Sequence, residues 1–94
     1  LLLVNPYNDY FSMNEENVRI RTIEEIIEDS QLVWHRDHYN RKVMVVEGEG
    51  WGLQFDNEKP FTLEKGKMYH IPKMMYHRVW RGKGDLTMKI WDEE

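Results

Sequence analysis

The sequence reads HRDHYNRKVMVVEG over residues 35–48 and GKMYHIPKMMYH over residues 66–77, and these two stretches hold most of its structural information. His35 and Asp37 are two positions apart, so on an extended strand both side chains point to the same face. A glycine and a proline in the second stretch mark turns before its closing His77. We therefore expect the strands to bring two histidines and an aspartate into one pocket.

Outside these stretches, apolar residues alternate with a period of two, which is typical of strands with one buried face. The alternating sets are Val43 and Val45, then Trp51, Leu53 and Phe55, and finally Leu86, Met88 and Ile90. Segments rich in glycine, proline, aspartate and lysine separate them as turns. Short strands at this regular spacing predict an all-β fold, an antiparallel sandwich or barrel.

One segment near the beginning has helical rather than strand periodicity. Thr22 and Glu25 have the spacing of a capping box, and three isoleucines within residues 23–29 form an apolar stripe. This pattern predicts one short amphipathic helix over residues 23–29.

Length and composition limit the class of protein. A chain of 94 residues predicts a single domain, residues 1–94. Folding at this size buries only about 60 to 65% of the surface of the unfolded chain. A metal ion or a dimer interface would therefore add useful stability. The absence of cysteine excludes disulfides and thiolate ligands.

Charge and hydropathy exclude further classes. The net charge is −4 and the isoelectric point is about 5.6, which argues against nucleic-acid binding because phosphate neutralisation needs clustered lysine and arginine. No apolar run approaches the roughly 20 residues of a membrane span. The apolar start, Leu1 to Val4, lacks the basic flank and length of a signal peptide. We expect a cytoplasmic protein with no nucleic-acid or membrane partner.

The candidate site residues suit a transition metal. His35, Asp37 and His77 form a mixed imidazole and carboxylate set, which suits Fe(II), Mn(II), Ni(II), Cu(II) or Zn(II). Arg41 has the same strand parity as Val43, so its side chain is also expected to face inward. A guanidinium has no lone pair to offer, so Arg41 cannot ligate a cation.

The first stretch resembles the first motif of the cupin superfamily. That motif has a histidine, a second ligand two residues on, a glutamate four residues later and a glycine seven residues after that. The corresponding residues here are His35, Asp37, Arg41 and Gly48. An aspartate thus replaces one histidine of the usual ligand set, and an arginine replaces the glutamate.

The second stretch is similar to the second cupin motif, in which a proline follows a glycine by six residues and a histidine follows the proline by five. Gly66, Pro72 and His77 have this spacing, whereas Met74 replaces a common glycine and Arg81 a common asparagine. The resemblance covers about residues 32–91. It implies a small antiparallel jelly-roll barrel with a site inside, but leaves the reaction open.

Arg41 leaves two interpretations of the site. In one, it forms an ion pair with Asp37 and occupies the former metal position, which makes the protein metal-free. In the other, His35, Asp37 and His77 form a facial triad, and Arg41 faces the open positions as an anchor for a substrate carboxylate or phosphate. His38 is an alternative to Asp37 as the second ligand, although strand alternation turns it away from His35. His70 is expected to be an exposed or partly packed residue.

Two functions correspond to these interpretations. The first is binding of a divalent transition metal (Fe, Mn, Ni or Zn) and an anionic small molecule, for an oxygenase, isomerase or lyase reaction whose catalytic residues the sequence does not identify. The second is a metal-free, non-catalytic protein that binds a small molecule or carbohydrate or serves in assembly, with an ion pair of Arg41 and Asp37 in place of the metal.

The aromatic residues suggest two further roles. Trp51 is expected to fill the barrel, and the alternative is that Trp51 or Tyr76 lines the mouth and stacks on a ligand. Trp34, Trp80 and Trp91 have the opposite parity to the inner face. Exposed tryptophans on a small domain indicate a partner surface, so we predict a homodimer that buries them.

Overall fold

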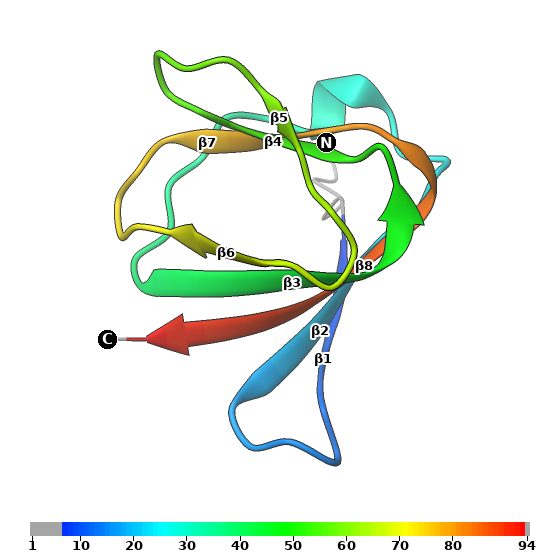
Figure 1. Cartoon of the computed structure of the whole chain (residues 1–94), viewed down its shortest axis with the longest axis vertical. Helices are drawn as coiled ribbons and strands as arrows, with labels where there is room; N and C mark the ends of the chain where they lie inside the picture. Colours follow the sequence, from blue (N-terminus) through cyan, green and yellow to red (C-terminus); the bar gives the residue numbers. More distant parts are fainter. Residues whose placement is uncertain (1–6, 94) are drawn as a thin grey trace, which may run out of the picture.

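Two antiparallel sheets face each other in the computed structural model, which describes residues 7–93 (Figure 1). One sheet has five strands in the order β1-β2-β8-β3-β6, and the other has three in the order β5-β4-β7. The strands are β1 (Asn8–Phe11), β2 (Val18–Ile23), β3 (Asn40–Glu49), β4 (Gly52–Phe55), β5 (Phe61–Thr62), β6 (Met68–Ile71), β7 (His77–Trp80) and β8 (Lys83–Glu93). They form the predicted small antiparallel jelly-roll barrel. The apolar start, Leu1 to Val4, lies outside the described residues.

The central pair of the larger sheet follows the period-two pattern of the sequence. Val43 lies opposite Ile90 and Val45 opposite Met88, and all four side chains are buried. Register shifts after Val45 interrupt the pairing of β3 with β8. Bulges of this kind increase local twist and bend a strand. They occur where β3, still paired with β8, bends toward β4 (Figure 1).

The hydrophobic core lies between the sheets. Trp51 is 1% exposed, and its indole Nε1 donates a hydrogen bond of 3.2 Å to the carbonyl oxygen of Gly84. Because a buried indole N–H needs an acceptor, this bond makes the burial of the large ring favourable. Leu53 and Leu86 pack in the same cluster and are almost fully buried.

The predicted helix over residues 23–29 is wrong. Ile23 is the last residue of β2 and pairs with Leu86, while Ile26 is 82% exposed. A carboxylate oxygen of Asp85 accepts the backbone N–H of Glu25 at 2.8 Å, so a tertiary contact replaces the expected cap. The helical element here is a single 3₁₀ turn, η1 (Asp29–Gln31). Among residues 7–93, no helix has the length and apolarity needed to cross a membrane.

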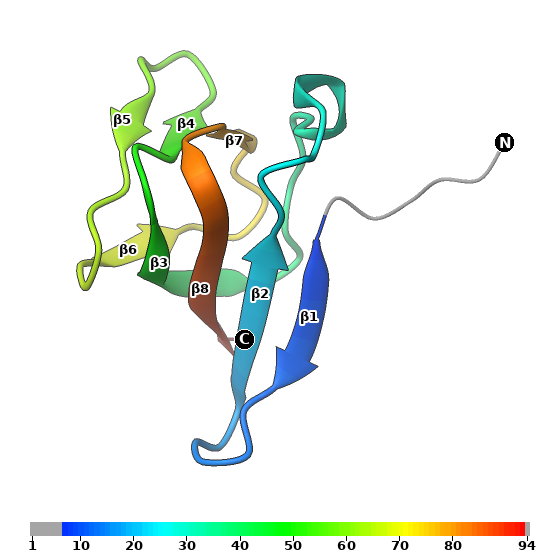
Figure 2. The ribbon, with the colours of Figure 1, turned by 90° about the vertical axis from the view of Figure 1, so that its right-hand side faces the viewer.

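The hairpin at the edge of the larger sheet extends beyond the smaller sheet. Strands β1 and β2 form this hairpin, with β2 paired to β8 (Figure 2). The inward positions of β2 include Arg19 and Arg21, which line the interior cavity together with residues of β3, β7 and β8. The hairpin therefore adds two charged side chains to the wall of the cavity.

Candidate metal centre

A short backbone bridge brings the two histidines of the separate motifs together. The N–H of His35 donates to the carbonyl oxygen of His77 at 2.9 Å, and the N–H of His77 donates back at 3.0 Å. The imidazole rings are consequently 4.2 Å apart between centroids. His77 is 2% exposed, whereas the His35 side chain is 41% exposed. One ligand is thus deep in the barrel and the other lies nearer solvent.

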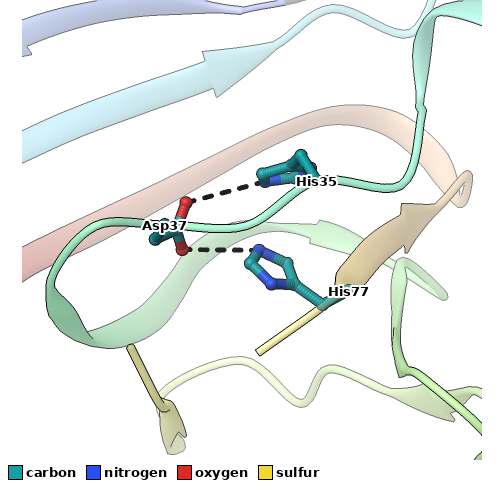
Figure 3. A group of neighbouring side chains, drawn as sticks. All are labelled: His35, Asp37 and His77. Atoms are coloured by element: carbon teal, nitrogen blue, oxygen red, sulfur yellow. Dashed lines mark ion pairs between the residues drawn. The ribbon is translucent and has the colours of Figure 1, made fainter. Parts of the chain in front are cut away.

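Asp37 is fixed by a contact between the two motifs. Its carbonyl oxygen accepts the backbone N–H of Met74 at 2.8 Å. Met74 has a φ of 64°, in the left-handed region that favours glycine. Met74, at the position where the second motif commonly has a glycine, therefore adopts a backbone conformation that glycine favours. The Asp37 side chain is only 7% exposed and points toward both imidazoles (Figure 3).

Hydrogen bonds determine which ring nitrogens face the carboxylate. Nδ1 of His77 lies 2.8 Å from the carbonyl oxygen of Met75, and Nδ1 of His35 lies 3.1 Å from that of Val33. A carbonyl oxygen only accepts, so both Nδ1 atoms carry hydrogen, and in a neutral ring Nε2 keeps the lone pair. Backbone carbonyls orient metal-binding histidines in the same way.

The Nε2 atoms of His35 and His77 lie close to the Asp37 carboxylate. Nε2 of His77 lies 3.4 Å from Oδ2 of Asp37, and Nε2 of His35 lies 3.8 Å from Oδ1 (Figure 3). All three ligand atoms lie within 4.8 Å of one another. Oδ2 of Asp37 is buried and has no hydrogen-bond partner among the described residues. A buried unpaired carboxylate oxygen is costly, and a cation between these atoms would satisfy it.

The local environment favours the neutral form of His77. Burial lowers the pKa of His77 below its ordinary value of 6.5, and the nearby His35 and Arg41 lower it further. The Met75 carbonyl and Asp37 act in the opposite direction but do not outweigh burial. A neutral imidazole is the form that binds a metal ion.

Arg41 lies beside the same carboxylate and is held from its other side. Its Nη1 is 3.2 Å from Oδ1 of Asp37, and its Nε donates to Oδ1 of Asp92 at 2.7 Å. The ion pair of Arg41 with Asp37 and the cluster of His35, Asp37 and His77 therefore coexist in one structure. Oδ2 of Asp37 remains available because no described residue forms a hydrogen bond with it.

The candidate ligands and Arg41 face an interior cavity of about 370 Å³. Most of the other wall residues are apolar, including Val43, Leu53, Val79 and Met88. Volumes of this size hold small-molecule ligands in other proteins. The arrangement can therefore combine a polar binding centre with an apolar chamber.

The remaining predicted residues lie elsewhere. Trp51 is in the core and does not line the cavity, so the stacking role considered for it does not fit its position. Tyr76 is 39% exposed, packs edge-on against Trp34 and lies outside the cavity wall. His38 and His70 are both exposed, and neither belongs to the cluster of His35, Asp37 and His77.

Sequence reasoning missed the charged residues behind Arg41. Asp92 accepts from Arg41 and also from Nη2 of Arg19 at 2.7 Å. Asp9 then holds Arg21 through two hydrogen bonds of 2.8 and 2.9 Å. The alternation of arginines in β2 was a usable signal, but the predicted helix over the adjacent residues obscured this strand.

Comparisons with known proteins agree with this fold. No protein-family model and no curated protein matches the sequence. A cupin-2 domain protein from Shewanella frigidimarina superposes with a TM-score of 0.65 at 22% identity, over 93% of this chain and 79% of its own. A cupin domain from Bordetella pertussis superposes with a TM-score of 0.62 at 14% identity, over 99% of this chain and 98% of its own. Fe(II)-HppE in complex with substrate gives 0.65 at 14% identity, over 98% of this chain and 55% of its own.

These structural neighbours define the class of the fold. The chain has the cupin fold, as its two motifs suggested. Identities of 14 to 22% establish the fold alone and leave the chemistry to the residues of the site.

Proposed function

We propose that this chain binds a divalent transition metal through His35, Asp37 and His77, and an anionic small molecule in the same barrel. The observation that supports this function is the approach of two imidazole Nε2 atoms to the Asp37 carboxylate, whose Oδ2 has no hydrogen-bond partner among residues 7–93. Without a cation, two lone pairs face the carboxylate at 3.4 and 3.8 Å. A bound ion turns this repulsion into coordination.

Two imidazoles and one carboxylate form an open ligand set, which leaves positions for an exogenous ligand. When bound, the metal supplies Lewis acidity or, as iron, oxygen activation. The three protein ligands hold the ion, and Arg41 orients an anionic group beside it. This combination suits an oxygenase, isomerase or lyase. The fold is similar to that of Fe(II)-HppE, an iron(II) protein whose structure was solved with its substrate. This similarity is compatible with these three reaction classes.

Metal titration tests the proposal directly. Protein stripped with a chelator and dialysed is titrated calorimetrically with Mn(II), Ni(II), Zn(II) and, under anaerobic conditions, Fe(II). We expect one ion per chain and a higher melting temperature, since an ion at one hundred times its Kd stabilises by about 2.7 kcal/mol. Asp37→Asn keeps the shape but removes the charge and should abolish binding. Failure of all four ions to bind or to stabilise the protein would contradict the proposal.

A metal-free function is the second candidate, and the contact of Arg41 with Asp37 at 3.2 Å favours it. In that case the guanidinium neutralises the carboxylate, and the cavity binds a small molecule or carbohydrate without a metal, or the fold serves in assembly. The titration separates the two candidates, because this one predicts no stabilisation by any of the four ions.

A further inference from the structure

A continuous series of ion pairs runs along the cavity wall behind the proposed metal centre. Its members are, in order, Asp37, Arg41, Asp92, Arg19, Asp9 and Arg21. Four of them, Asp37 and the three arginines, line the cavity itself. The series connects β1, β2, β3 and β8, so one electrostatic unit extends across the larger sheet.

The series is balanced in charge. Three guanidinium groups face three carboxylates, and Asp37, Arg41 and Arg21 are each 8% exposed. A divalent ion on Asp37 therefore brings two uncompensated positive charges into a cavity whose wall is largely apolar. Such charge is costly unless a counter-ion accompanies it. Binding of an anion in this cavity is therefore favoured only when the metal is bound.

Arg41 is the residue that can bind this anion. A cation on Asp37 competes with Nη1 of Arg41 for the carboxylate, which weakens the contact of 3.2 Å between them. The bond of 2.7 Å from Nε to Asp92 keeps the guanidinium at the cavity wall. Metal binding thereby turns a neutralised arginine into a donor for a second anion, and a guanidinium binds a carboxylate well.

The rest of the cavity indicates what the anion carries. Leu53 and Val79 face it from the smaller sheet, and Met88 and Ile90 face it from β8. The cavity of about 370 Å³ is near the lower end of the range of about 300–1,000 Å³ for small-molecule sites, so it suits a short ligand. The chamber therefore fits a short apolar body attached to one anionic group.

We propose that Arg41 is a metal-dependent carboxylate receptor, and that the ligand of the barrel is a small carboxylic acid with an apolar body whose binding is cooperative with the metal. This inference rests on the proposed metal function. Because linkage is reciprocal, the carboxylate must raise the affinity for the metal by the factor by which the metal raises the affinity for the carboxylate.

The test measures that reciprocity on chelator-stripped wild-type protein with Mn(II) and hexanoate as probes, since a simple monocarboxylate complexes free Mn(II) weakly. We expect the affinity for Mn(II) to rise about tenfold in saturating hexanoate and the affinity for hexanoate to rise equally in saturating Mn(II). Hexanol, with the apolar body alone, and acetate, with the charge alone, should each give a smaller effect.

Arg41→Gln should still bind Mn(II) but lose the effect of hexanoate, whereas Arg36→Gln, an exposed arginine stacked on Tyr76, should retain it. If wild-type protein binds Mn(II) with an affinity that hexanoate leaves unchanged, the inference is overturned and the metal function stands. If wild-type protein binds none of the titrated metals, both are overturned. Retention of the coupling in Arg41→Gln also overturns the role of Arg41.

Discussion

The backbones of His35 and His77 exchange two hydrogen bonds, of 2.9 and 3.0 Å, although the residues belong to separate motifs of the sequence. Main-chain atoms alone make this contact, so substitution of either side chain leaves it available. The closure of the barrel and the binding of a metal can therefore be tested separately.

His77→Ala should abolish metal uptake while the protein still folds. The substitution removes a buried imidazole and its hydrogen bond to Met75, which costs about 1–3 kcal/mol of unfolding free energy. Elemental analysis of the purified variant and urea unfolding measure the two effects. His70→Ala, which changes an exposed histidine, should keep wild-type metal content. A full complement of metal in His77→Ala would contradict the ligand assignment.

Arg41→Glu should strengthen metal binding. The change removes a guanidinium 3.2 Å from Asp37 and supplies a carboxylate at the position where cupin motifs have glutamate. We expect the Kd for Mn(II) or Zn(II) to fall at least tenfold, or about 1.4 kcal/mol. Isothermal titration measures it against Arg36→Glu, which makes the same charge change at an exposed position. If the Arg41 variant binds metal no better than wild type, the residue does not act at the metal centre.

The metal-free protein should lose stability as the pH falls below 6.5. The pKa of His77 is lowered from 6.5 in the folded state by burial, so between that lowered pKa and 6.5 the unfolded chain binds more protons than the folded one. Unfolding free energy therefore falls with falling pH across this window and becomes constant, for this group, below it. Urea unfolding of chelator-treated protein at several pH values measures the slope. His77→Gln should show a smaller slope, and an equal slope would assign the effect to other groups.

The fold was predictable because two kinds of signal agreed. The alternation of apolar residues predicted strands β3 and β8, and the spacing of Gly66, Pro72 and His77 predicted the turn that leads to β7. The helix failed because a local pattern of isoleucines and a capping box competed with strand pairing. Ile23 gains more by burial opposite Leu86 than a short isolated helix can supply.

Sequence reasoning predicted only some of the residues around the site. His35, Asp37 and His77 followed from motif spacing, whereas Asp92 became visible only through its pairing across the sheet with Arg41. In β2 the alternation does not mark one apolar inner face: Arg19 and Arg21 line the cavity, and Val18, of the opposite parity, is buried as well. Ion pairing with residues of other strands reverses the ordinary preference, and it is not a local property of the sequence.

Gly82→Ala should be strongly destabilising. A Cβ at this position would overlap the carbonyl oxygen of Glu49 and the backbone nitrogen of Trp51, neither of which can move as a flexible side chain does. We expect a loss of at least about 2 kcal/mol, since overpacking of a rigid contact typically costs 1–3 kcal/mol. Chemical denaturation measures it, with the exposed Lys83→Ala as the matched control. A change below about 0.5 kcal/mol would show that this close approach is not required.

The exposed tryptophans give the last prediction, a homodimer in solution. Trp34 and Trp80 both lie near the Arg78 guanidinium group, with ring centroids 5.1 and 4.3 Å from its central carbon, and they remain 38% and 42% exposed. Exposed aromatic and arginine side chains are enriched where protein partners bind. Sedimentation equilibrium should show a dimer for wild type and for Met13→Lys, which changes a fully exposed residue of the β1–β2 turn. The double variant Trp34→Lys and Trp80→Lys should sediment as a monomer. A dimer in that double variant, or a wild-type monomer at all concentrations, would exclude this face as the interface.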